Sequence, residues 1–91
     1  MVWIRRGVDW RPNWQIDNAV RKMESKFRDV DIFVTSCRDG MHGLGTLHHQ
    51  GDAIDIRPLS GYIVGDVEMC IGQGFDVVDE RNHWHIEWDP K

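Results

Sequence analysis

Near the end of the chain, one segment alternates strictly between polar and apolar side chains. Residues 83–88 read His-Trp-His-Ile-Glu-Trp. Successive side chains of a β-strand point to opposite faces of a sheet, so His83, His85 and Glu87 would share one face. Trp84, Ile86 and Trp88 would occupy the other face, which is apolar. The segment therefore predicts a strand in a sheet that buries one face and leaves the other polar.

A second segment follows the same rule. Residues 53–57 read Ala-Ile-Asp-Ile-Arg, which directs Ile54 and Ile56 into the core and Asp55 to the polar face. If the two strands belong to one sheet, the polar face can present Asp55 beside His85.

The remaining elements complete a small α+β pattern. Asn13 can cap a helix whose apolar positions recur at helical spacing up to Phe27. Residues 31–36 and 75–78 read as strands, 63–71 as a short helix that ends at Gly72, and 79–82 as a hairpin connection. Residues 1–12 are expected to be irregular. We therefore expect one domain over residues 1–91, with a small, mostly antiparallel sheet and one or two packed helices.

Composition limits the function classes. A chain of 91 residues has a marginal core, which five tryptophans and a bound metal would help to stabilise. The net charge of −4, without a basic tract, argues against nucleic acid as a partner. The apolar runs are too short to span a membrane, and the N-terminus lacks the apolar region of a signal peptide. We expect a monomer that is synthesised in the cytoplasm.

Four of the five histidines fall into two tight groups, His48-His49 and His83-Trp84-His85. The first group runs into Gly51 and then Asp55, and Gly51 allows the chain to turn back toward the strand. Two histidines and a carboxylate from separate segments are the ligands of an open zinc site that keeps one position for water. Cys37 and Cys70 are isolated thiols without a CxxC spacing, and a ligand role for either is the lesser alternative.

Three motifs together resemble a known superfamily. Residues 46–55, Thr-Leu-His-His-Gln-Gly-Asp-Ala-Ile-Asp, are similar to the S-x-H-x-x-G-x-A-x-D signature of the D-alanyl-D-alanine metallopeptidases. His83-Trp84-His85 resembles the downstream H-x-H of these proteins, and residues 34–38 resemble the upstream strand that ends in a serine and an arginine. The superfamily includes D-Ala-D-Ala carboxypeptidases, phage L-alanoyl-D-glutamate endopeptidases and the Hedgehog signalling domain. The resemblance implies a fold of this type.

Residue by residue, the resemblance implies that His48, Asp55 and His85 bind Zn²⁺. His48 is preferred to its neighbour because it stands seven residues before Asp55 and three before Gly51, as the signature requires. The resemblance also implies that Arg38 contacts the carbonyl or carboxylate of a substrate.

The general base is less well defined by the resemblance. Many relatives carry an acid three residues before the last ligand, where this chain has Asn82. Glu80, His83 and Asp79 stand close by in the sequence, and we rank them in that order as the residue that handles the proton.

The implied function is a zinc peptidase that hydrolyses stem peptides of bacterial peptidoglycan, at a D-Ala-D-Ala end or an L-Ala-D-Glu link. Such an enzyme would reach the cell wall by phage-type release or as a virion component. The alternative is a catalytically silent zinc domain that serves binding, as in Hedgehog, and Asn82 favours it.

Overall fold

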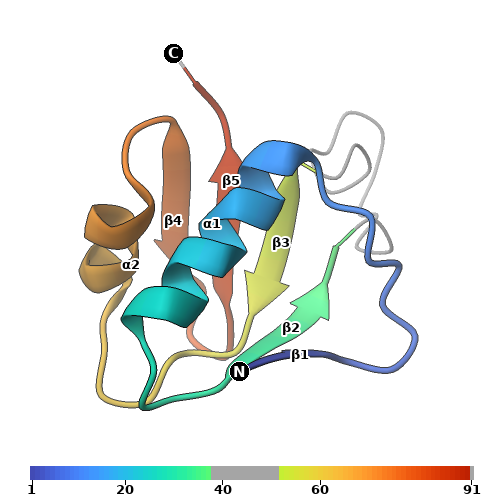
Figure 1. Ribbon diagram of the computed structural model, residues 1–91, viewed down its shortest axis with the longest axis horizontal. Coiled ribbons are helices and arrows are strands. Elements are labelled where there is room, and N and C mark those ends of the chain that lie inside the picture. The colour runs from blue at the N-terminus through green and yellow to red at the C-terminus, as the bar shows by residue number, and fades with distance from the viewer. Residues whose placement is uncertain (38–51, 91) are drawn as a thin grey trace.

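The computed structural model describes residues 1–37 and 52–90. Their elements are, in chain order, β1 (Val2–Ile4), α1 (Trp14–Lys26), β2 (Ile32–Ser36), β3 (Ala53–Ile56), α2 (Val64–Ile71), β4 (Phe75–Asp79) and β5 (Trp84–Trp88). The strands form one sheet in the order β1-β2-β3-β5-β4, and both helices pack on one side of it (Figure 1). The α+β class expected from the sequence is confirmed.

Helix α1 begins and ends where the sequence predicts. The side-chain oxygen of Asn13 accepts a hydrogen bond from the Ile16 backbone N–H at 2.8 Å, which satisfies one of the unpaired donors of the first turn. Apolar residues at helical spacing then form a buried stripe: Ile16, Ala19, Val20 and Met23. Helix α2 ends at Gly72, which has a φ of +87° and donates its N–H to the Glu68 carbonyl.

The first strand corrects the expectation that residues 1–12 are irregular. Val2–Ile4 pairs in parallel with β2, in the register Val2↔Ile32 and Ile4↔Val34. Nothing in three residues reveals a partner about thirty positions away, so local pattern cannot predict such a strand. The other strand pairs are antiparallel, so the sheet is mostly antiparallel, as expected.

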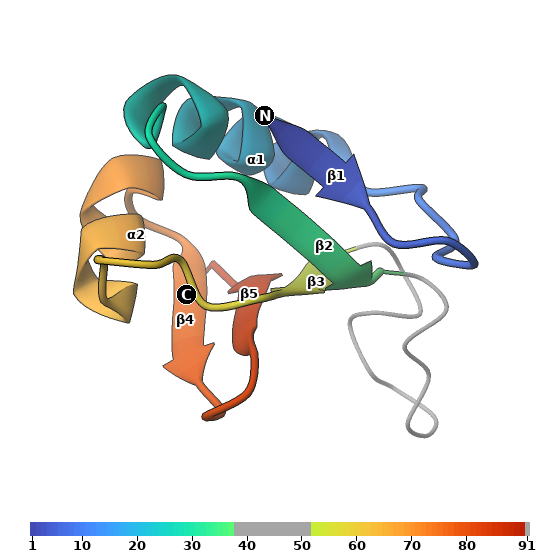
Figure 2. The ribbon, with the colours of Figure 1, turned by 90° about the horizontal axis from the view of Figure 1, so that it is seen from below.

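The two faces of the sheet differ as the alternating pattern predicts. The core face carries side chains that pack beneath α1 and α2: Ile32, Val34, Ile54, Ile56, Trp84 and Ile86. We call the other side the open face, and it carries Phe33, Asp55, His85 and Glu87. No described helix packs on the open face, because both helices lie on the opposite side of the sheet (Figure 2). In the part of the chain that the structure describes, neither helix is long and apolar enough to cross a membrane.

Candidate metal centre on the open face

Asp55 and His85 lie directly opposite each other on adjacent strands. The register of β3 and β5 pairs them, and the Nδ1 of His85 is 2.9 Å from the Oδ1 of Asp55. Both side chains are largely covered, with 17% of His85 and 13% of Asp55 exposed. The two strands thus bring together the residues that the alternating pattern placed on one face.

The second ring nitrogen of His85 also meets a carboxylate. Its Nε2 lies 2.9 Å from the Oε1 of Glu87, two residues further along β5. His85 is therefore held between two acidic side chains, one on each nitrogen. Sequence reasoning assigns no role to Glu87, and the signal that could have found one is its i+2 spacing from His85 on the same strand face.

These carboxylates raise the pKa of His85 above its ordinary value. The hydrogen bond with Asp55 contributes most, because it stabilises the protonated ring. Burial lowers the pKa of His85, and Glu87 raises it by a smaller amount than Asp55 does. Without a metal, His85 therefore retains its proton to a higher pH than a solvated histidine.

An irregularity in β2 lies next to Asp55. The register between β2 and β3 shifts between Val34 and Ser36, and the hydroxyl of Thr35 lies 3.4 Å from the Asp55 carbonyl oxygen, to which it donates a hydrogen bond. Bulges of this kind redirect side chains and are common beside functional sites. This one lies where β2 meets the strand that carries Asp55.

His83 lies on the open face beside this pair. Its Nε2 is 4.0 Å from the Oδ1 of Asp55, and its Nδ1 is 2.6 Å from the side-chain oxygen of Asn82. An amide oxygen only accepts hydrogen bonds, so Nδ1 of His83 is the donor. In the neutral ring, Nε2 then carries the lone pair and can take up a proton. Asn82 thus orients His83.

The two acidic candidates lie elsewhere in the β4–β5 hairpin. Asp79 pairs with Trp84, which places it on the core side of the sheet, and its Oδ1 accepts a hydrogen bond from the Arg81 backbone N–H at 2.9 Å. Glu80 is exposed in the turn, where its backbone N–H donates to the His83 carbonyl. Of the three candidates for the base, His83 is the one whose side chain lies next to Asp55.

Asp55 and His85 together offer one oxygen and one nitrogen donor, which are donor types that zinc binds. Zinc takes nitrogen and oxygen donors at about 2.0–2.2 Å, and tetrahedral geometry then places neighbouring donors roughly 3.3 Å apart. The observed 2.9 Å between Nδ1 and Oδ1 is close to this spacing, so a small displacement of two side chains suffices. Glu87 on the other ring nitrogen supplies the carboxylate that commonly orients a ligating histidine. His48, His49 and Arg38 lie outside the described residues.

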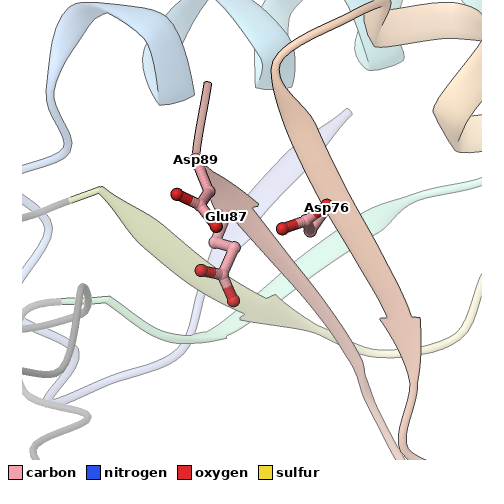
Figure 3. Close-up of side chains that lie close together, drawn as sticks. All are labelled: Asp76, Glu87 and Asp89. Carbon is pink, nitrogen blue, oxygen red and sulfur yellow. The ribbon is translucent and has the colours of Figure 1, made fainter. Parts of the chain in front are cut away.

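A second acidic cluster, which shares Glu87 with this site, lies at the end of the same face. The carboxylates of Asp76, Glu87 and Asp89 come within 4.8 Å of one another and belong to β4 and to β5 with the residue that follows it (Figure 3). An all-oxygen set is typical of hard cations such as Ca²⁺ rather than zinc. Asp89 is exposed, and Glu87 already bonds to His85, so the cluster by itself does not define a metal site.

The sequence matches no protein-family model, and no curated protein matches it either. The resemblance to the D-alanyl-D-alanine metallopeptidases therefore rests on the three sequence motifs alone.

Proposed function

We propose that this protein is a zinc-dependent peptidase that hydrolyses peptide bonds of peptidoglycan stem peptides. The observation that supports it most is the side-by-side placement of Asp55 and His85 on the open face, with Glu87 holding the far side of the imidazole. The sequence motifs add His48 as the third ligand and suggest the substrate. Zinc held there would supply a Lewis acid that polarises a peptide carbonyl and lowers the pKa of water.

The residues of the chain have distinct parts in this proposal. Glu87 accepts the Nε2 proton of His85, which fixes the tautomer in which Nδ1 is available as a ligand. His83 is the group that moves the proton, because Asn82 holds its Nδ1–H and leaves Nε2 directed toward the region of Asp55. This geometry favours His83 over Glu80, which ranked first on sequence alone, and over Asp79.

The metal part of the proposal is tested by composition and stability. Elemental analysis should give about one zinc per chain, and a His85→Ala variant should lose it. Chelation should lower the melting temperature and added zinc should restore it, since binding energy contributes to the stability of a small domain. A zinc-free native protein, or full zinc retention in the variant, would contradict the assignment.

The catalytic part needs purified peptidoglycan and mass analysis of the released fragments. Release of terminal D-Ala or of stem peptides is the expected result. His83→Ala should reduce the rate by about 10²–10⁴-fold with the zinc content unchanged. Glu80→Ala and Asp79→Ala are the comparison variants, and Glu68→Gln, on the exposed side of α2, is the control for loss of a surface carboxylate. Full activity of His83→Ala would refute its role.

The competing proposal is a catalytically silent zinc domain that binds cell-wall material. Asn82 favours it, because an amide replaces the acid found in many relatives. Zinc-loaded protein that cuts no muropeptide would support this second function.

A further inference from the structure

A small pocket lies on the helix side of the sheet, away from the open face. It has a volume of about 210 Å³ and is formed by one side of α1 together with the ends of α2, β4 and β5. We call it the Trp14 pocket. Its lining includes Trp14, Gln15, Asn18, Gln73, Phe75 and Trp88.

The Trp14 pocket has an unusual wall. The indole of Trp14 is 70% exposed, although tryptophan is a residue that proteins normally bury. Its backbone is nevertheless fixed, because Trp14 is the first residue of α1 and follows the helix cap Asn13. The Asn13 side chain also donates a hydrogen bond to the Asp52 carboxylate, which ties the start of α1 to the segment that leads into β3. The exposed indole is thus presented from a rigid support.

The floor of the pocket is aromatic and firmly packed. Phe75 and Trp88 meet edge to face, with ring centroids 5.0 Å apart. Gly74 leaves no room behind the Trp88 ring, since a Cβ at this position would lie 2.3 Å from the ring atom Cζ3. The Trp88 backbone N–H donates to the Asp52 carbonyl at 2.8 Å. A floor held in this way is already in place before a ligand arrives, which lowers the entropy cost of binding.

The rim of the pocket is neutral and rich in amides. Gln15, Asn18 and Gln73 each offer two N–H donors and a carbonyl acceptor, and Lys22 is the one charged side chain among the lining residues. A phosphate-bearing ligand would need more positive charge than one lysine provides in a chain of net charge −4. The volume lies below the roughly 300–1,000 Å³ of drug-sized ligand sites. The lining therefore suits a small neutral ring that has an apolar face and polar edges.

We propose that the Trp14 pocket binds a neutral sugar ring of a glycan, with an N-acetylhexosamine as the preferred unit. The C–H face of a pyranose packs against the electron-rich face of an indole, while its hydroxyl and acetamido groups bond to side-chain amides. The neutral sugar chemistry follows from the pocket lining, and the preference for an N-acetylhexosamine rests on the proposed function. The assignment of the glycan to peptidoglycan rests on the proposed peptidase function. Trp88 is three residues from His85, or roughly 10 Å along β5, and the two side chains lie on opposite faces of the sheet.

The test is a binding titration followed by tryptophan fluorescence, with chitotriose, cellotriose and peptide-free peptidoglycan strands as ligands. It does not depend on zinc or on turnover, so it can be repeated with the His85→Ala protein. Trp14→Ala is the test variant, and Trp3→Ala is the matched control because Trp3 is also exposed but lies on β1. We expect chitotriose to bind, and Trp14→Ala to weaken binding at least about tenfold while Trp3→Ala does not.

Each outcome has a defined meaning. Stronger binding of peptidoglycan strands than of chitotriose supports the cell-wall source, and equal binding supports N-acetylhexosamine chemistry in general. Equal binding of cellotriose overturns the N-acetyl preference. Absence of binding to all three ligands, or binding that Trp14→Ala leaves intact, overturns the pocket assignment. Sugar binding by a protein without peptidase activity would reject the proposed function and leave the pocket standing.

Discussion

Replacement of Gly74 by alanine tests how β4 and β5 close the end of the sheet. Gly74 has a φ of +93°, where a side chain is strained by about 1–3 kcal/mol. The new Cβ would also lie 2.3 Å from Cζ3 and 2.7 Å from Cη2 of Trp88. The indole packs on Phe75, so it must move against a neighbour, and such overpacking costs about 1–3 kcal/mol. We therefore expect Gly74→Ala to lose about 2–6 kcal/mol of unfolding free energy.

Gly61→Ala is the matched control for this substitution. Gly61 has a φ of +86°, but a Cβ there would meet nothing within 4 Å. Gly61→Ala should therefore lose the unfolding free energy that backbone strain costs, without the steric clash that Gly74→Ala makes with the Trp88 ring. In a domain of this size 1 kcal/mol corresponds to about 4–8 °C, so Gly74→Ala should melt at least about 4 °C below Gly61→Ala.

Urea and thermal unfolding of both variants measure the difference. A double-mutant cycle with Trp88→Leu then isolates the contact, because the smaller side chain should remove the extra penalty of Gly74→Ala. Equal melting temperatures for the two glycine variants would refute the reasoning, as would an extra penalty that persists in the Trp88→Leu background.

Three further predictions concern the site and the core. In zinc-free protein, His85 should titrate above the ordinary pKa of about 6.5, and Asp55→Asn should lower that pKa; NMR titration that finds no change would contradict the assigned cause. Because the folded pKa is the higher one, this contribution to stability is complete below about pH 6.5 and is lost as the pH rises through the folded pKa, which urea midpoints across pH can follow. Glu87→Gln should weaken zinc binding by about 10–100-fold in competition titrations with a chelator, and unchanged affinity would remove its orienting role. Ile86→Ala removes a fully buried side chain and should cost about 2–5 kcal/mol in urea unfolding, whereas a cost near zero would show that the core repacks freely.

In the sequence alone, the segments that alternate between polar and apolar residues determined the strands and which side chains lie on each face of the sheet. The pattern from His83 to Trp88 predicted β5, with Trp84 and Ile86 buried and His85 on the polar side, because the side-chain period of a strand is fixed at two. The Asn13 cap and the apolar stripe likewise predicted α1, since capping and helical periodicity both act within a few residues.

The tertiary structure decided everything that depends on pairing between distant segments. Only the sheet register places Asp55 opposite His85 at 2.9 Å, because a shift by one residue would turn one of them to the core. The same register sends Asp79 to the core side. The parallel pairing of β1 with β2 had no local signal at all. Side-chain partners such as Glu87 on His85 follow from packing in three dimensions, and a sequence pattern can narrow the candidates for such contacts without selecting among them.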